Sequence, residues 1–370
     1  MDAHSLVYPE FWQSEESHVL SQHRIMPVPD LPCPSLVFAT SGSTGQARHV
    51  VLSKKSLLLS AMVVNEHLQA DATSVWGLCL PWWHVGGMGV IARAYQAGAI
   101  FSLGPPRWQV EDCVRWLRDE AVTHLSLVPT QVHDLVAAEY RAPSSLRAVV
   151  VGGGRLERDL GRKARDLGWP VLASYGMTEA GSQIATQDLS ALQHPYTSEP
   201  IPILPCWNVR TMEVGIFEIS GPVLFHGEMI GDPDAWHYES RRGEWYQTQD
   251  CGDVIDGQLR LRHRADTLVK VLGELVDPTA IESQLAQAGL PVGRFAVIAV
   301  ADARQEHRLV LVHEALAPSL LESALASYHD DSPGYARIAN QQSITVFPRS
   351  DLGKILRREL AERIGPSLSV

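Results

Sequence analysis

The sequence has little cysteine, and its cysteines form no recognisable set. Only five occur among 370 residues, widely scattered and never in a C-x-x-C pair: Cys33, Cys79, Cys113, Cys206 and Cys251. An odd and scattered set indicates neither a disulfide framework nor a zinc site. We therefore interpret the cysteines as small buried hydrophobic residues of a protein from a reducing compartment.

Long apolar runs and an excess of positive charge are absent as well. No eighteen apolar residues occur in succession, and residues 1–14 lack the basic end and apolar stretch of a signal peptide. We therefore expect a cytoplasmic protein without a membrane span. Lys and Arg number 31 against 42 Asp and Glu, a formal net charge of -11. Such a surface repels polyanions, which argues against nucleic acid as a main partner.

What the chain does have is apolar material for about two domains, since 45% of its residues are hydrophobic. In the first half, apolar runs alternate with segments of helical periodicity at 54–68 and 110–120. The runs predict strands at 35–39, 75–80, 123–128, 146–151 and 171–174. This alternation predicts an α/β domain in which helices cover the sheets.

The second half changes character twice. From about residue 190, short strands at 209–211, 215–220 and 259–262 predict a β-rich subdomain that closes the large domain. After residue 266, strands at 267–272, 295–300 and 308–313 and helices at 278–288 and 318–328 predict a small α+β domain. We therefore predict an N-terminal domain of residues 1–265 and a C-terminal domain of residues 266–370. The sequence leaves a homo-oligomer open.

One segment has the composition of a phosphate loop. Residues 40–45 carry four hydroxyls and two glycines directly after an apolar run, and Arg48 follows. Such a turn can bring N–H and O–H donors onto phosphate oxygens. It is not a Walker loop, because two residues rather than four separate Gly42 from Gly45. From composition alone, an ordinary surface loop is the alternative.

A second glycine pattern lies at 87–92 and fits G-x-G-x-x-A by letter. Residues 81–84 interrupt any strand leading into it, so we do not interpret it as a dinucleotide fingerprint. We predict instead that His84 lies between Trp83 and a Gly-rich turn. A satisfied core histidine is the alternative for His84.

Eight segments in a fixed order resemble the adenylate-forming superfamily, which holds acyl-CoA synthetases, luciferases and peptide-synthetase adenylation domains. They are the loop at 40–48, L-P-W-W-H at 80–84, V-G-G-G at 151–154, Y-G-M-T-E at 175–179, W-Y-Q-T-Q-D at 245–250, R-A-D at 264–266, K-V-L-G-E at 270–274 and G-K-I-L-R at 353–357. Each is weak alone, but together they are collinear. The resemblance implies a large N-terminal domain and a small mobile C-terminal domain.

The resemblance also implies a nucleotide site. Donors to the β- and γ-phosphates would come from Thr40, Ser41, Gly42, Ser43, Thr44, Gly45 and Arg48. The adenosine would lie against Gly152, Gly153, Gly154, Tyr175, Gly176, Asp250 and Arg264. Thr178 would hydrogen-bond the α-phosphate, and Glu179 would ligate Mg²⁺. The implied small-molecule partners are ATP with Mg²⁺, coenzyme A and a carboxylic acid.

Three further residues take roles from the same resemblance. Lys354 would stabilise the charge that builds up when a carboxylate attacks the α-phosphorus of ATP. Asp266 would be the hinge between the domains. His84 would be a wall or gate of the acid pocket. The other pocket walls come from dispersed segments, with Ser126, Thr130 and Ser182 as candidates by position.

The chain departs from the family pattern at several points. The phosphate loop usually ends in Pro-Lys, whereas this chain has Ala47-Arg48, which keeps the charge but changes its shape. Gln249 replaces the glycine of the usual T-G-D segment. Only about forty residues precede the phosphate loop, which is shorter than in many members, so we expect part of the usual N-terminal subdomain to be missing.

Compactness, the segment at 81–87 and Gln249 resemble the o-succinylbenzoate-CoA ligases of menaquinone biosynthesis in particular. This resemblance predicts the ATP-dependent ligation of o-succinylbenzoate to CoA through an acyl-adenylate, with release of AMP and pyrophosphate. One alternative is a CoA ligase or adenylating enzyme for another aryl or short-chain acid. Another is a non-catalytic acyl-nucleotide binding protein.

Overall fold

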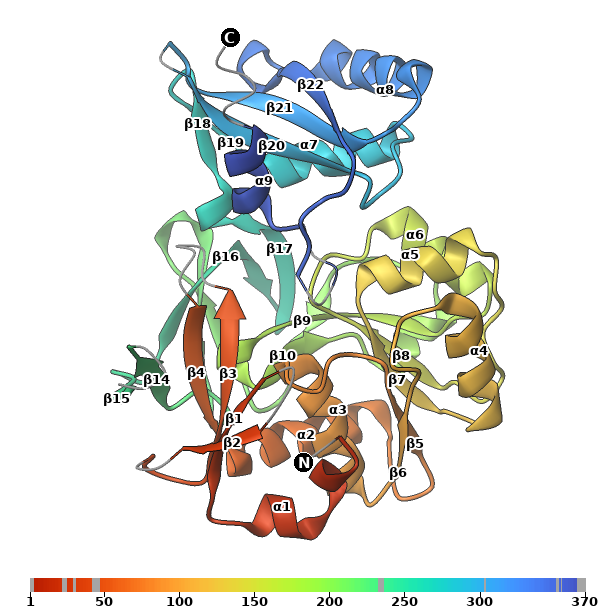
Figure 1. Ribbon diagram of the computed structural model, residues 1–370, viewed down its shortest axis with the longest axis vertical. Helices are drawn as coiled ribbons and strands as arrows, with labels where there is room; N and C mark the ends of the chain where they lie inside the picture. The colour runs from red at the N-terminus through yellow and green to blue at the C-terminus, as the bar shows by residue number, and fades with distance from the viewer. Residues whose placement is uncertain are drawn as a thin grey trace. The chain divides into compact units, whose positions relative to one another are not determined.

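The computed structural model describes residues 3–21, 25–28, 31–41, 47–231, 236–302, 304–350, 353 and 355–364. The chain divides into two compact units (Figure 1). Unit 1 comprises Met1–Thr248 and Asp253–Arg260, and unit 2 comprises Gln249–Gly252 and Leu261–Val370. The domain boundary that we expect between residues 265 and 266 stays a prediction.

The first sheet of unit 1 contains the hairpin that carries the predicted phosphate segment. Its strand order is β15-β14-β4-β3-β1-β2. Strand β3 pairs antiparallel with β4 and parallel with β1, and its middle is fully buried at Leu36, Val37 and Phe38. The elements are α1 (Pro9–Gln13), β1 (Ser17–Leu20), β2 (Ile25–Val28), β3 (Ser35–Ser41), β4 (Ala47–Ser53), β14 (Gly227–Ile230) and β15 (His237–Ser240).

The second sheet of unit 1 has the order β10-β9-β8-β7-β5-β6 and is parallel except for β10, which runs antiparallel to β9. Strands β5, β7 and β8 are buried along their whole length, as unbroken apolar runs predict for strands covered on both faces. The strands are β5 (Val75–Leu78), β6 (Ile100–Leu103), β7 (His124–Leu127), β8 (Ala148–Val151), β9 (Val171–Met177) and β10 (Ser182–Thr186).

Helices cover this sheet from both sides: α2 and α3 lie on one side and α4, α5 and α6 on the other (Figure 1). They are α2 (Lys54–Leu68), α3 (Val85–Ala97), α4 (Val110–Asp119), α5 (Pro129–Ala137) and α6 (Arg158–Asp166). Local sequence sets the ends of α2. The Ser53 side chain caps its first turn by accepting from the Ser56 N–H, and Gln69 ends it in the left-handed conformation.

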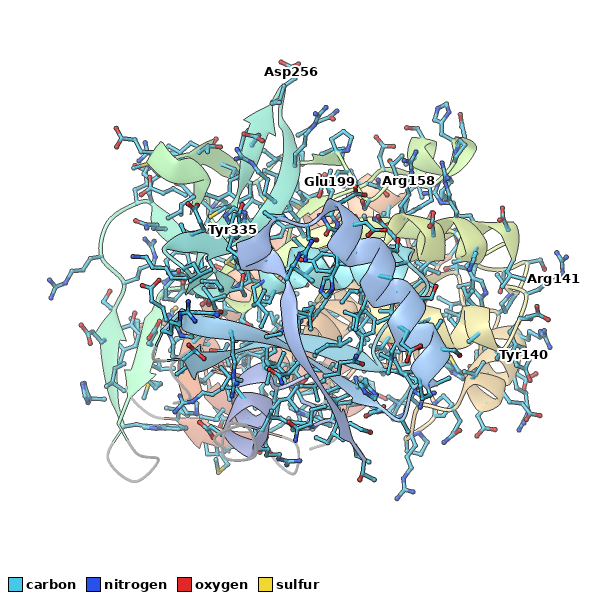
Figure 2. The ribbon with its side chains drawn as sticks, turned by 90° about the horizontal axis from the view of Figure 1, so that it is seen from above. Tyr140, Arg141, Arg158, Glu199, Asp256 and Tyr335 are labelled. Atoms are coloured by element: carbon cyan, nitrogen blue, oxygen red, sulfur yellow. The ribbon has the colours of Figure 1, made fainter. Side chains whose placement is uncertain are left out.

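The third sheet has the order β11-β17-β16-β13-β12. Residues 249–252 of β16 and 261–264 of β17 belong to unit 2. Asp256 stands at the tight turn between β16 and β17 with a φ of 49° and points away from the sheet (Figure 2). The strands are β11 (Ile201–Pro202), β12 (Asn208–Thr211), β13 (Ile216–Ser220), β16 (Tyr246–Ile255) and β17 (Gln258–Arg264).

Unit 2 is an α+β unit with its own core. The hairpin β18-β19 and one face of the sheet β20-β21-β22 pack with α7 and α8 around the fully buried Leu285, Leu311 and Ala324. Helix α9 packs on the other face of the sheet through Leu360 and Ile364. The elements are β18 (Val269–Val271), β19 (Glu274–Val276), α7 (Pro278–Gln287), β20 (Phe295–Asp302), β21 (Glu306–Glu314), α8 (Pro318–Asp331), β22 (Ile338–Ile344) and α9 (Arg357–Ile364).

The predicted fold class is confirmed: the molecule is a mixed α/β protein with helix-covered sheets in a large N-terminal part. The predicted helix at 54–68 matches α2 residue for residue, and the predicted strands all coincide with observed ones. Elements without a strong local pattern, such as β1, β14, β15, β22 and α3, were not predicted. Within the described ranges, no helix combines the length and apolar character that crossing a bilayer requires.

Candidate active site

The predicted phosphate segment spans the tip of the β3–β4 hairpin. Thr40 pairs with Arg48 across the two strands, and the Thr40 hydroxyl donates to the Arg48 carbonyl oxygen at 3.4 Å. The backbone of Ser41 belongs to β3. Of the predicted phosphate donors, Gly42, Ser43, Thr44 and Gly45 lie outside the described residues. The hairpin therefore places the two ends of the segment side by side.

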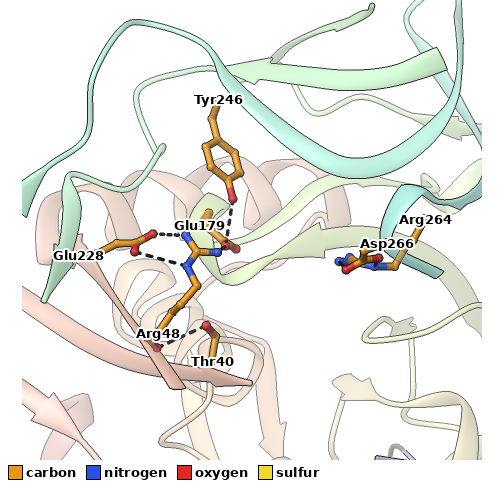
Figure 3. Close-up of polar contacts among 7 residues, drawn as sticks. All are labelled: Thr40, Arg48, Glu179, Glu228, Tyr246, Arg264 and Asp266. Carbon is orange, nitrogen blue, oxygen red and sulfur yellow. Dashed lines mark hydrogen bonds and ion pairs between the residues drawn. The ribbon is translucent and has the colours of Figure 1, made fainter. Parts of the chain in front are cut away.

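Arg48 is the centre of a charged cluster in unit 1 (Figure 3). Its guanidinium lies 3.1 Å from Glu179 Oε1 and forms a two-pronged ion pair with Glu228 of β14. The hydroxyl of Tyr246, from β16, donates to Glu179 Oε1 at 3.2 Å. Residues 48, 179, 228 and 246 thus come together from four separate segments of the chain.

The charges of this cluster shift its pKa values in a consistent way. The hydrogen bonds that Arg48 donates to the Glu228 carboxylate raise the pKa of Arg48 above its usual range. Burial, together with the neighbouring Glu179 carboxylate, raises the pKa of Tyr246 to about 12, so its hydroxyl stays a donor at neutral pH. Two carboxylates face one guanidinium, and the cluster therefore keeps an excess of negative charge that suits a further cation.

The Tyr175–Glu179 segment runs from the end of β9 into a 3₁₀ turn, η2 (Thr178–Ala180). Gly176 is required there, because a Cβ at this position would lie 1.6 Å from the Ser182 carbonyl oxygen of the adjacent strand β10. Tyr175 is 8% exposed, and its ring packs edge-on against Phe217 at 6.3 Å. The close pairing of β9 with β10 thus sets where Thr178 and Glu179 stand.

The predicted adenine-side loop, Gly152, Gly153 and Gly154, follows β8 directly. Gly153 has a φ of +75°, a conformation that glycine adopts without strain. A Cβ on Gly152 would lie 3.9 Å from the Ser174 carbonyl oxygen of β9. The loop and the Tyr175 segment therefore share the carboxyl edge of the parallel sheet, the edge at which α/β proteins bind ligands.

The Gly-rich turn that we predict after His84 is wrong. His84 is the N-cap residue of α3, and Gly86, Gly87 and Gly89 lie inside that helix. Gly87 is needed because a Cβ there would meet the Pro81 carbonyl oxygen at 2.2 Å. Burial of Met88, Val90 and Ile91, all 0% exposed, outweighs the roughly 1 kcal/mol by which each glycine disfavours a helix.

The aromatic residues before α3 pack against one another. The Trp82 and Trp83 rings meet edge-on at 5.5 Å, and the His84 ring lies 6.0 Å from that of Trp83. All three are partly exposed. They therefore form a continuous aromatic surface at the start of the helix.

Arg93, nine residues after His84 on α3, is a candidate site residue that sequence reasoning missed. It is 2% exposed, and its Nη1 donates to the Ser126 hydroxyl at 3.2 Å. A Cβ built on Gly89 would lie 3.0 Å from Arg93 Nη2 and 3.6 Å from Ser182 Cβ. The guanidinium thus contacts Ser126, one of the three polar residues that we predict for the acid pocket, and a second, Ser182, also lies near Gly89.

No carboxylate among the described residues forms an ion pair with Arg93. Burial lowers its pKa to about 10, which still leaves the side chain protonated at neutral pH. A buried cation without a counter-ion is costly, and such groups are normally paired. The arrangement therefore suits a ligand that brings its own negative charge.

Unit 2 holds a second group of predicted residues. Arg264 Nη1 lies 3.2 Å from Asp250 Oδ1, and the same guanidinium contacts both carboxylate oxygens of Asp266 at 2.9 Å (Figure 3). Asp266 lies in the 3₁₀ turn η5 (Ala265–Thr267). Arg264 thus binds both Asp250, the residue predicted to bind the ribose, and Asp266, the predicted hinge. Lys354 lies outside the described residues.

A comparison with known families decides the classification. The family described as "AMP-binding enzyme" matches residues 6–213, more than half of the chain. The chain belongs to this family. The resemblance drawn from the motifs is therefore confirmed.

Two curated relatives are both named 2-succinylbenzoate–CoA ligase. That of Enterococcus faecalis is 27% identical over 304 residues, covering 78% of this chain and 61% of the relative. That of Bacillus licheniformis is 29% identical over 261 residues, covering 67% and 53%. The chain thus spans less than two thirds of the length of these relatives.

Solved structures of similar fold include o-succinylbenzoate CoA synthetase (MenE) from Bacillus subtilis. Its complex with the acyl-adenylate OSB-AMP has a TM-score of 0.75 at 23% identity, with 88% of this chain and 68% of that chain covered. Its complex with ATP and magnesium ion has a TM-score of 0.73 at 22% identity, with 91% and 73% covered. At these identities, the likeness establishes the fold.

Proposed function

We propose that this chain is an AMP-forming acid–CoA ligase whose acid is an aromatic dicarboxylate, o-succinylbenzoate. The substrate assignment rests on the buried Arg93 guanidinium, which lacks an acidic partner among the described residues and donates to the Ser126 hydroxyl. One carboxylate of the acid reacts, and the other would supply the missing charge. The names of the two curated relatives support this assignment.

In the first step, an oxygen of the reacting carboxylate attacks the α-phosphorus of ATP, a P–O bond breaks, and pyrophosphate leaves. We infer that Thr178 hydrogen-bonds the α-phosphate and that the 40–48 segment holds the leaving phosphates. Lys354 would stabilise the developing negative charge. Asp250, with Arg264 beside it, would accept hydrogen bonds from the ribose hydroxyls.

The net negative charge of the Arg48 cluster, two carboxylates and one guanidinium, suits a magnesium ion. Within the described part of the chain, no three His, Cys, Asp or Glu side chains are grouped to hold a metal on their own. Mg²⁺ normally takes one or two carboxylates together with substrate phosphates, so Glu179 would hold it and the ion would neutralise charge on the pyrophosphate. Arg48 and Tyr246 keep the Glu179 carboxylate oriented.

In the second step, the thiolate of CoA attacks the acyl carbon of the adenylate, a thioester forms, and AMP leaves with the bridging oxygen. Asp266 would serve as a hinge between the two steps. Its carboxylate is held by Arg264, so a change of backbone angles there would alter that ion pair.

The test is CoA-dependent AMP release with o-succinylbenzoate and with its two monocarboxylate analogues, 4-oxo-4-phenylbutanoate and 2-butanoylbenzoate. A buried cation left without its carboxylate costs several kcal/mol, so we expect the diacid to be preferred by roughly a hundredfold or more in kcat/KM. A ratio near one would overturn the substrate and leave a ligase for another aryl or short-chain acid. Absence of pyrophosphate release with every acid would indicate a non-catalytic binding protein.

A further inference from the structure

The guanidinium of Arg93 rests on the face of a buried tryptophan. Arg93 Cζ lies 5.2 Å from the centroid of the Trp76 ring, and Trp76, on β5, is 0% exposed. Cation–π attraction is stronger when both partners are removed from water. The ring therefore helps to hold the guanidinium in place.

A single amide ties this ring to the helix that carries Arg93. Asn65, on α2 and 3% exposed, accepts from Trp76 Nε1 at 3.2 Å through its Oδ1. Its Nδ2 donates to the Arg93 carbonyl oxygen at 3.0 Å and to Gln96 Oε1 at 3.0 Å. Asparagine is suited to this place because one side chain supplies both an acceptor and two donors.

A histidine ring also packs against Trp76. The His124 ring lies 5.0 Å from that of Trp76, with an angle of 36° between the planes. His124 Nε2 lies 3.3 Å from the Leu68 carbonyl oxygen, which can only accept, so Nε2 carries the proton and Nδ1 accepts from the Thr123 hydroxyl at 2.8 Å. A neutral imidazole supports the ring without adding a second positive charge.

We propose that Trp76 and Asn65 are positioning residues that aim the Arg93 guanidinium at the non-reacting carboxylate of the acid. The inference rests on the proposed function, because Arg93 must meet an anionic group of the substrate. Neither residue touches the substrate in this scheme. Both act by holding the ring and the helix turn on which Arg93 depends.

The test compares Trp76→Phe and Trp76→Leu with the parent chain. Phe keeps an aromatic face and loses only the N–H bond to Asn65, whereas Leu removes the face. The readout is the ratio of kcat/KM for o-succinylbenzoate over that for the better of its two monocarboxylate analogues. We expect this ratio to fall about fivefold for Phe and about thirtyfold for Leu, mainly through KM for the diacid.

Trp169→Phe is the matched control. Trp169 is 1% exposed, and its Nε1 donates to the Tyr140 carbonyl oxygen at 2.8 Å, so the control also removes one buried indole hydrogen bond. It should leave the ratio unchanged. Introduced into an Arg93→Met chain, Trp76→Phe should have no further effect on the ratio, because there is no guanidinium left to aim.

The outcomes separate this inference from the proposed function. If Arg93→Met abolishes the preference for the diacid but Trp76→Phe and Trp76→Leu lower the activity on all three acids equally, the two residues are structural only and the inference is overturned. If Trp76→Leu fails to fold, Trp76→Phe decides alone. If the parent chain shows no preference for the diacid, the proposed substrate and the inference fall together.

Discussion

Two arginines of unit 1 have opposite surroundings. Arg48 is 37% exposed at its side chain and faces two carboxylates, of which Glu228 raises its pKa through a hydrogen bond. Arg93 is buried beside a hydroxyl and an indole ring, and burial lowers its pKa to about 10. Arg48 thus has two carboxylates around one positive charge, whereas Arg93 has no carboxylate partner among the residues that the structure describes.

The difference separates two tasks within one unit. The ion pairs of Arg48 orient the Glu179 and Glu228 carboxylates, and in the proposed function the same guanidinium stands at the end of the segment that holds the phosphates. A buried guanidinium without a counter-ion is stabilised by any carboxylate that enters beside it. On this view, cation chemistry belongs to the Arg48 cluster and recognition of the acid belongs to Arg93.

The largest effect is expected for Glu179→Gln. The amide keeps a hydrogen bond to Arg48 but removes the charge that would hold Mg²⁺, so pyrophosphate release should fall ~10²–10³-fold, with a raised magnesium requirement. Glu228→Gln is the matched control and should lose less than about tenfold, because its carboxylate only anchors Arg48. Equal losses in the two variants would show that Glu179 acts through Arg48 alone.

Acid should disturb the surroundings of Arg93 through His124. Burial lowers the pKa of His124 from 6.5 to about 4, so between these pH values the unfolded chain binds a proton that the folded chain does not. Stability is therefore complete above pH 6.5 and is lost as the pH falls towards 4, by about 3 kcal/mol from this group. Urea unfolding at several pH values should show a weaker dependence in His124→Gln, whereas the exposed His237→Gln should behave as the parent.

Replacing each arginine by methionine tests the comparison directly. Arg48→Met leaves two carboxylates without their cation and should lower the free energy of unfolding by about 1–2 kcal/mol, a figure reduced for solvent screening. Arg93→Met removes an unbalanced buried charge and should leave the stability equal or higher, while the preference for the diacid disappears. A larger loss of stability in Arg93→Met, measured by urea unfolding, would contradict the assignment of Arg93 to ligand recognition.

The smallest effect is expected at a third arginine. Arg264 is 45% exposed at its side chain, and its ion pair with Asp266 is screened by water. Asp266→Ala should therefore change the free energy of unfolding by less than about 1 kcal/mol. Thermal unfolding at low and high salt provides the measurement, and a change of several kcal/mol would place Asp266 in a structural role instead of a hinge.

Local sequence could predict those parts of the site whose conformation depends on residues close together in the chain. In the loop after β8 and in the 175–179 segment the structure shows a physical reason for a glycine, a positive φ at Gly153 and a close approach to β10 at Gly176. Strands β5, β7 and β8 were predictable because burial on both faces requires unbroken apolar runs. The same reasoning misread the glycines of α3, since the packing that makes them helical comes from Pro81 and from distant parts of the core.

The sequence by itself determined the fold class, the family and the order of the motifs, because apolar periodicity and short glycine-rich segments act over a few residues. Only the tertiary structure decided which charges are balanced. Glu228 reaches Arg48 across 180 positions of sequence, whereas the described surroundings of Arg93, a hydroxyl and an indole ring, form only once α3, β5 and β7 are packed together. Electrostatic energies depend on distance and burial in space, and neither can be read from separation along the chain.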